Sequence, residues 1–195
     1  MAYVILGLGN RGAEYAKTRH NAGRMVAELL ADKEGFEWKL NKAAQAIVAQ
    51  GAFDDQKVVV ALPETMMNLS GKSAAALVKS KAAAKKLLVI RDELDLPLGT
   101  IKMTMPGRGS GGHKGVESVI KAVKTEGFVR VRIGIASSAS VVKKSQDDKT
   151  VEKIILGKFT PDQMAILKKM GKQIAEGLVV LITESRDKAM SQYHA

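Results

Sequence analysis

The sequence contains no cysteine, which excludes disulfide bonds, thiolate metal sites, redox dithiols and cysteine nucleophiles. It also has only 4 prolines and no long polar repeat, which argues against a disordered chain. No apolar run approaches the ~18 residues of a membrane-spanning helix, and no targeting signal is recognised. We therefore expect a protein that works away from membranes in the cytoplasm, with an organelle as the open alternative.

Acidic residues are scarce relative to basic ones. The chain carries 31 lysines and arginines against 20 aspartates and glutamates, a formal net charge of +11. This excess is larger than solubility requires and favours a polyanionic partner, of which nucleic acid is the first candidate. With 195 residues and 46% hydrophobic content, the chain suits one domain with a sizeable core.

Apolar, β-branched runs alternate with helical patterns, which predicts one α/β domain over residues 1–195. Strands are expected at 3–8, 46–53, 57–62, 86–91, 100–105 and 129–135. Helices are expected at 21–34, 69–83, 114–125 and 161–186. A turn at 54–56 joins two of these strands as a hairpin, so the sheet is expected to be mixed. Segments 105–115 and 137–150 are expected to be mobile loops.

The first strand leads into a glycine motif, with Gly7, Gly9 and Gly12 in the G-x-G-x-x-G spacing of dinucleotide-binding proteins. Such a site also needs an acidic residue at the end of a second strand, about 20 positions further on. Asp32 stands at about this distance but falls within a helical pattern. A Walker A phosphate loop fails as well, because Met66 occupies the position where that loop needs glycine.

Two titratable residues are candidates for catalysis. His20 stands in a polar segment just before a predicted helix, and Asp92 follows an apolar strand. The structural alternatives are a core histidine and a solvated acidic turn. The functional interpretation pairs the two, because a carboxylate can fix the tautomer of a histidine and raise its basicity. Ser70 and Ser110 lack the G-x-S-x-G context of a nucleophile, so hydrolysis would use water.

Asn68 precedes a helical run, where a side chain of this type either caps the helix or binds a ligand. A side-chain amide has both a donor and an acceptor, which suits it to hold a peptide main chain. The sequence leaves both interpretations open.

Six segments occur together in one order: GLGNRGAEYAKTRHNAG, MMNLSGK, DELDLPLG, SGGHKG, RVRIGI and ILGKF. Over about residues 3–160 they closely resemble bacterial-type peptidyl-tRNA hydrolase. The resemblance implies a single α/β domain with a mixed, twisted central sheet flanked by helices. It also implies a monomer without metal or other cofactor, which hydrolyses the ester between a peptide and the 3′ ribose of tRNA.

The resemblance further implies roles for individual residues. His20 would be the general base that activates water, and Asp92 would orient it. Asn10 and Asn68 would hold the peptide main chain beside the ester. The other implied substrate contacts are Tyr15 and Met67 in the cleft, Lys102 and Arg132 near the tRNA 5′ phosphate, and His113 and Lys114 in the loop that flanks the cleft.

Two positions depart from the family pattern. Arg11 stands where the family usually has proline, which loses a fixed φ and adds a charge. Lys114 stands where asparagine usually follows the histidine of the glycine-rich loop. A lysine cannot accept a hydrogen bond, and its charge is expected to lower the pKa of His20.

The departure at Lys114 leaves an alternative function open: an RNA-binding relative of the chloroplast intron-splicing-factor type, with the same fold and without catalysis. His20, Asp92, Asn10 and Asn68 favour the hydrolase, because a binding module has no need for this combination.

Overall fold

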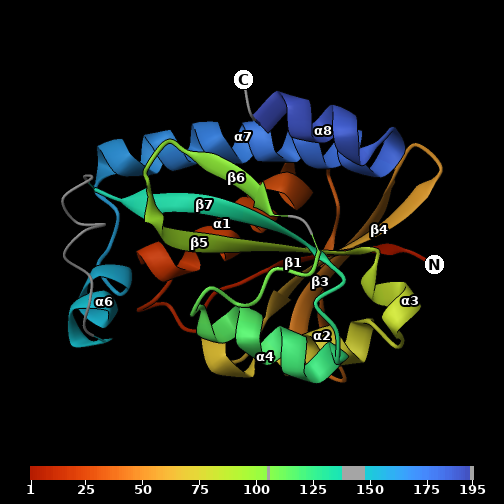
Figure 1. Cartoon of the computed structure of the whole chain (residues 1–195), viewed down its shortest axis with the longest axis horizontal. Helices are drawn as coiled ribbons and strands as arrows, with labels where there is room; N and C mark the ends of the chain where they lie inside the picture. The colour runs from red at the N-terminus through yellow and green to blue at the C-terminus, as the bar shows by residue number, and fades with distance from the viewer. Residues whose placement is uncertain (105, 138–147, 194–195) are drawn as a thin grey trace.

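The structure is a computed structural model that describes residues 1–104, 106–137 and 148–193. Its centre is one mixed seven-stranded sheet, with the strand order β2-β3-β4-β1-β5-β7-β6 (Figure 1). The strands are β1 (Tyr3–Gly7), β2 (Trp38–Asn41), β3 (Ala46–Phe53), β4 (Gln56–Pro63), β5 (Leu87–Pro97), β6 (Ile101–Thr104) and β7 (Val129–Ala136). β1, β4, β5 and β7 are parallel to one another, whereas β2, β3 and β6 pair antiparallel to their neighbours. The single α/β domain and mixed sheet predicted from the sequence are confirmed.

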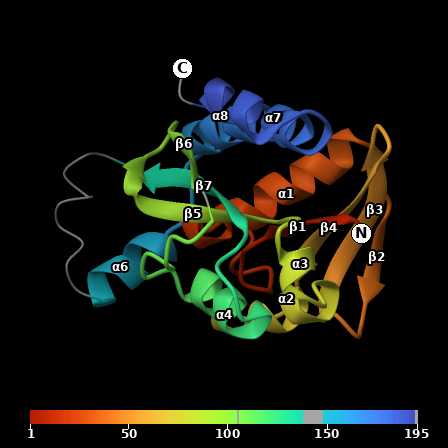
Figure 2. The same ribbon diagram turned by 45° about the vertical axis from the view of Figure 1, so that its right-hand side comes forward.

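Helices cover both faces of this sheet. Their bounds are η1 (Arg19–Asn21), α1 (Ala22–Lys33), η2 (Met67–Leu69), α2 (Gly71–Leu77), α3 (Lys81–Ala84), α4 (Lys114–Val123), α6 (Asp148–Ile155), α7 (Pro161–Thr183) and α8 (Arg186–Tyr193). Both views place α1, α7 and α8 on one face and α2, α3 and α4 on the other (Figures 1 and 2). None of the helices in the described ranges is long and apolar enough to cross a membrane.

Two apolar cores result from the alternation of side chains along the central strands. In β5, Leu88 and Ile90 join the core under α1 and α7, whereas Leu87 and Val89 join the core under α2 and α4. All four side chains are almost fully buried. Burial of such a side chain contributes about 1.5–3 kcal/mol to stability, so the sheet is a rigid support for the loops at its edge.

Some elements differ from the sequence prediction. The short strand β2 was not predicted, because its four residues WKLN are too few for a clear pattern and are only partly buried. The helix expected at 69–83 is broken, since Val78 is buried with an extended backbone and Ser80 caps the separate α3. The last helix begins at Pro161 as predicted, where Thr160 and Gln163 form a capping box, but it ends at Thr183.

The two predicted loops also have different outcomes. Residues 106–113 form no helix or strand, and Gly107, Gly111 and Gly112 have positive φ, as a glycine-rich loop requires. Of the segment 137–150, residues 138–147 lie outside the described residues. Residues 148–150 begin α6 rather than continue a loop, which corrects the prediction. The mobility of both segments stays a prediction.

Candidate active site

His20 is held over the edge of the sheet by a close contact between α1 and two strands. A Cβ atom at Gly23 would lie 2.3 Å from the carbonyl oxygen of Ile90 and 2.9 Å from that of Leu8. Only glycine therefore allows the first turn of α1 to pack against Leu8, just after β1, and against Ile90 within β5. His20 in the preceding η1 is thereby brought to the same edge as Asp92.

Asp92 lies further inside a strand than the sequence predicted, since β5 continues to Pro97. Its position is still an edge, because β1 ends at Gly7, whose partner in β5 is Ile90. Beyond Ile90, β5 has lost its neighbour on that side while it still pairs with β7. The Asp92 side chain can therefore contact His20 in η1 and His113 just before α4.

His20, Asp92 and His113 form one buried cluster. The Nδ1 atom of His20 lies 3.0 and 2.9 Å from the two carboxylate oxygens of Asp92, and the Nε2 atom of His113 lies 2.9 Å from Oδ1. The two imidazole rings are 5.1 Å apart between centroids. All three residues are less than 9% exposed. The predicted pairing of His20 with Asp92 is present, and His113 is a second imidazole on the same carboxylate.

The tautomer of His113 is fixed by α4. His113 is the N-cap residue of this helix, and its Nδ1 atom accepts hydrogen bonds from the backbone N–H groups of Gly115 (3.1 Å) and Val116 (3.3 Å). The ring proton therefore resides on Nε2 and is donated to Asp92. Burial lowers the pKa of His113 in spite of the nearby carboxylate, so this ring stays neutral.

The pKa of His20 moves in the opposite direction. Burial acts to lower it, but the charge of Asp92 and its hydrogen bond raise the pKa above the ordinary value of 6.5. Lys114 opposes this rise, as expected from the sequence, but does not reverse it. Burial acts to raise the pKa of Asp92, yet the two imidazoles hold it well below the usual range.

These protonation states leave one imidazole nitrogen available. His20 donates from Nδ1 to Asp92, so a neutral His20 carries its lone pair on Nε2. Within the described residues this atom makes no hydrogen bond, and 9% of the side-chain surface remains exposed. A base of this kind can accept a proton from a bound water molecule.

The same cluster is the one group of described residues whose ligand atoms could together hold a metal ion, since they lie within 4.8 Å of one another. The ligand set suits zinc in composition, but His113 is poorly prepared for it. Its Nδ1 is occupied by two backbone donors, so Nε2 would have to lose its proton to bind a metal. The hydrogen-bond pattern fits a proton-transfer site better than a metal centre.

Asn10 is fixed beside this cluster by a second asparagine. Its backbone N–H donates to Oδ1 of Asn21 (2.9 Å), and Nδ2 of Asn21 donates to the carbonyl of Asn10 (3.0 Å). Oδ1 of Asn10 accepts a hydrogen bond from the backbone N–H of Met67 (2.7 Å). The Nδ2 group of Asn10 has no partner within the described residues, so it can donate to a ligand.

The segment of Met67 and Asn68 lies against the start of α4. Met67 is buried, and a Cβ atom at Gly115 would lie 2.4 Å from its sulfur. Asn68 is exposed and its side chain does not cap α2, whose N-cap residue is Ser70. Tyr15 lies half buried in the turn after Gly12, and no hydrogen bond joins its side chain to the cluster.

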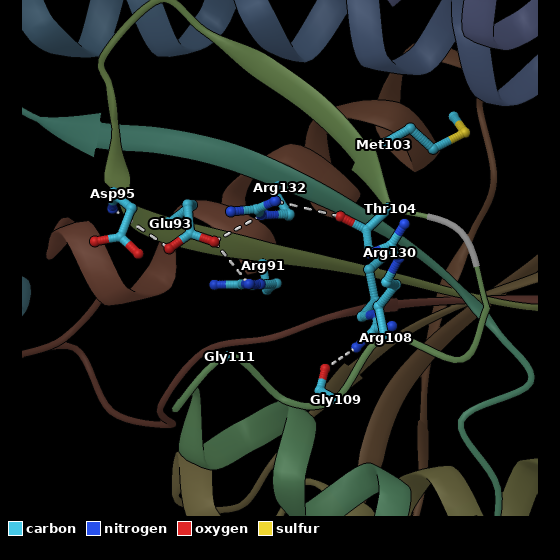
Figure 3. A pocket seen from close by; sticks show the side chains of 10 residues that line it. All are labelled: Arg91, Glu93, Asp95, Met103, Thr104, Arg108, Gly109, Gly111, Arg130 and Arg132. Carbon is cyan, nitrogen blue, oxygen red and sulfur yellow. Dashed lines mark hydrogen bonds and ion pairs between the residues drawn. The ribbon is translucent and has the colours of Figure 1, made fainter.

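A second polar region, here called the arginine pocket, includes the two residues that flank Asp92 in β5, Arg91 and Glu93 (Figure 3). It is lined by Arg91, Glu93, Asp95, Met103, Thr104, Arg108, Gly109, Gly111, Arg130 and Arg132. Glu93 accepts from Arg91 (2.7 Å) and Arg132 (2.6 Å), and Arg130 donates to the carbonyl of Gly109. Four arginines against two acids leave the pocket positively charged.

Strand alternation explains which basic residues line this pocket. Arg130 and Arg132 share a face of β7, because they stand two residues apart in the strand, and both line the pocket. Lys102 stands opposite Arg132 in the pairing of β6 with β7, but its exposed side chain is not part of the lining. Lys114 is exposed at the start of α4 and does not line the pocket either.

Sequence reasoning did not select four of these buried polar residues: Asn21, Arg91, Glu93 and Arg130. A signal was present in the run Arg91-Asp92-Glu93. Because β5 continues through it, Asp92 points to one face and its two neighbours to the other. Reading the run as the end of a strand concealed this alternation. Asn21 carries no comparable signal, since its role depends on the position of Asn10.

Known proteins match the chain over its whole length. A family model described as peptidyl-tRNA hydrolase matches residues 4–195. The peptidyl-tRNA hydrolase of Thermodesulfovibrio yellowstonii is 38% identical over 194 residues, which cover 98% of each chain. That of Mycobacterium tuberculosis is 38% identical over 193 residues, covering 98% of this chain and 97% of the relative. The crystal structure of peptidyl-tRNA hydrolase from Acinetobacter baumannii superposes with a TM-score of 0.87 at 32% identity, covering 100% of this chain and 95% of that one. The chain is therefore an enzyme of the peptidyl-tRNA hydrolase family.

Proposed function

We propose that this protein hydrolyses the ester between a peptide and the 3′ ribose of tRNA, with His20 as the general base. The observation that carries the proposal is the hydrogen bond of His20 Nδ1 to Asp92, which leaves Nε2 as the free basic atom. Nε2 takes a proton from water as the water oxygen attacks the ester carbonyl. The proton then passes to the ribose oxygen, which leaves as a hydroxyl.

The supporting residues act on the base rather than on the substrate. Asp92 keeps the Nδ1 proton of His20 in place and stabilises the imidazolium formed during attack. His113 donates a second hydrogen bond to Asp92 and stays neutral, so it holds the carboxylate without competing as a base. Because an ester of a ribose hydroxyl is already reactive, neither a metal ion nor a covalent intermediate is needed in this mechanism.

The peptide main chain is held by Asn10 and Asn68. The free Nδ2 group of Asn10 is a donor for a peptide or ester carbonyl, and the exposed amide of Asn68 offers both a donor and an acceptor. Met67 packs on Gly115 beside them, and Tyr15 would be a further contact of the peptide. His113 and Lys114 close the cleft from the side of α4.

The tRNA is bound by the basic residues of β6 and β7. Arg132 would bind the 5′ phosphate in the arginine pocket, with Lys102 on the exposed rim of the same face. Arginine suits this position because its guanidinium group forms paired hydrogen bonds to phosphate oxygens. Binding of this kind depends strongly on salt, since it releases counterions from the RNA.

Two further expectations belong to the same proposal. We infer that the protein acts as a monomer, since His20, Asp92 and His113 all come from one chain. We also infer that it acts in the cytoplasm, where peptidyl-tRNA is released from ribosomes.

The test is the hydrolysis of a peptidyl-tRNA and of the matching aminoacyl-tRNA by the purified protein, with a His20→Ala control. Cleavage of the peptidyl-tRNA alone, lost in the control, is the expected result. If the protein binds the tRNA but cleaves neither ester, the RNA-binding alternative replaces this proposal.

A further inference from the structure

A groove runs between α2 and α4, beside the active site. The two helices lie side by side (Figures 1 and 2), because a Cβ atom at Gly71 would be only 2.1 Å from the carbonyl oxygen of Ser118. Gly71 N–H also donates to Ser118 Oγ (3.0 Å). The groove has a volume of about 640 Å³, which is in the range of small-ligand pockets.

The groove carries unpaired positive charge. Three lysines line it, Lys72, Lys114 and Lys121, together with the single acid Glu117. Glu117 is already paired with Lys121 at 2.8 Å. Within the described part of the chain, the side chains of Lys72 and Lys114 form no ion pair and no hydrogen bond. Two exposed ammonium groups are therefore left for an anionic ligand.

One end of the groove is continuous with the active site. Lys114 directly follows His113, and Asn68 directly follows Met67, whose backbone N–H donates to Asn10. A chain held by Asn10 and Asn68 can continue into the groove without crossing the cluster. The groove is thus placed to receive the part of the substrate that extends away from the ester.

The lining of the groove suits a peptide better than RNA. Leu69 is 42% exposed, and Ala75 and Ala122 add to an apolar floor. The lining contains no arginine and no aromatic ring, which are the groups on which single-stranded RNA bases stack. The arginines instead line the arginine pocket. Gly109 and Gly111 of the glycine-rich loop line that pocket, whereas Lys114, which follows the loop, lines the groove.

We propose that the α2–α4 groove receives the peptide portion of the substrate and prefers peptides with acidic side chains. Lys72 and Lys114 are the residues that set this preference. The inference rests on the proposed function and gives a use to the lysine that departs from the family pattern. Apolar side chains would contact the floor at Leu69, while carboxylates would pair with the two lysines.

The test compares three tripeptidyl-tRNAs that share one tRNA and one C-terminal residue. The two residues before it are both glutamate, both glutamine or both lysine, and the peptide is N-acetylated. At low salt, kcat/KM is expected to be about threefold higher for the glutamate than for the glutamine substrate, and about tenfold higher than for the lysine substrate. Pairs between exposed charges have effects of this size.

The variants Lys72→Gln and Lys114→Gln are each expected to reduce the preference for glutamate over lysine by about threefold. Lys85→Gln is the matched control, because it removes an exposed lysine outside the groove and should leave the preference unchanged. Equal rates for all three substrates would overturn the inference. Equal weakening of all three by Lys72→Gln would also overturn it and assign the groove to RNA.

Dissociation constants of amide-linked analogues of the same three substrates provide a second measurement that does not require hydrolysis. The glutamate analogue is expected to bind most tightly, the glutamine analogue less tightly and the lysine analogue least tightly. A protein that cleaves no substrate but retains this order would contradict the proposed function and still support the groove. Identical dissociation constants would reject the groove even in an active enzyme.

Discussion

The histidine cluster and the arginine pocket use neighbouring residues of one strand in opposite ways. Asp92 points to one face of β5, where two imidazoles share its carboxylate. Arg91 and Glu93 point to the other face, where Glu93 is shared by two guanidinium groups. In the cluster each proton has a defined position, whereas the pocket has an excess of positive donors. Proton transfer and phosphate binding are thus separated by strand alternation, and mutations should separate them too.

The largest expected effect comes from His20→Ala. Removal of the base should reduce kcat by about 10³- to 10⁴-fold, because general-base catalysis typically contributes factors in this range. The dissociation constant for tRNA should change little, since the arginine pocket is intact. Single-turnover hydrolysis and filter binding measure the two quantities. Substantial residual turnover would show that another group activates water.

Asp92→Asn should reduce kcat by about 10²-fold. An amide has no charge to stabilise the imidazolium, and the pKa of His20 should fall, because the interaction that raises it is lost. The acid limb of the pH profile of kcat/KM, which reports the free enzyme, should therefore move to lower pH. A profile that stays in place would mean that the limb belongs to another residue.

Arg132→Ala tests the arginine pocket, because Arg132 of β7 lines it together with Arg91 and Glu93 of β5. It should raise KM by about tenfold, leave kcat nearly unchanged and reduce the dependence of binding on salt. The effect should disappear with a substrate that lacks the 5′ phosphate. Lys102→Ala is the matched comparison, with an expected change of about twofold, because its side chain is exposed. Equal effects on substrates with and without the phosphate would place the 5′ end elsewhere.

The smallest expected effect is that of Lys114→Asn. Its charge opposes the rise in the pKa of His20, so its removal should raise that pKa further. Because His20 acts in its neutral form, the acid limb of the pH profile should move to higher pH, opposite to the shift in Asp92→Asn. An acid limb that stays in place would show that the charge of Lys114 does not act on His20.

The sequence predicted the elements that local patterns determine. The hairpin of β3 and β4 and the start of α7 follow from strand and helix patterns and a turn position. The pairing of His20 with Asp92 follows from their positions, one just before a helix and one after a strand. The role of His113 as a helix cap could not be read in this way, because it depends on how the glycine-rich loop folds back onto Asp92. The same holds for Asn21, which acts only through its contact with Asn10.

The direct test of the cluster is an NMR titration of its imidazoles. The chain has three histidines, so few signals need to be assigned. His20 should titrate with a pKa above 6.5, whereas His113 should remain neutral, with its proton on Nε2, to lower pH than an ordinary histidine. A His113 ring that gains a proton before His20, or carries its proton on Nδ1, would contradict the assignment of His20 as the base.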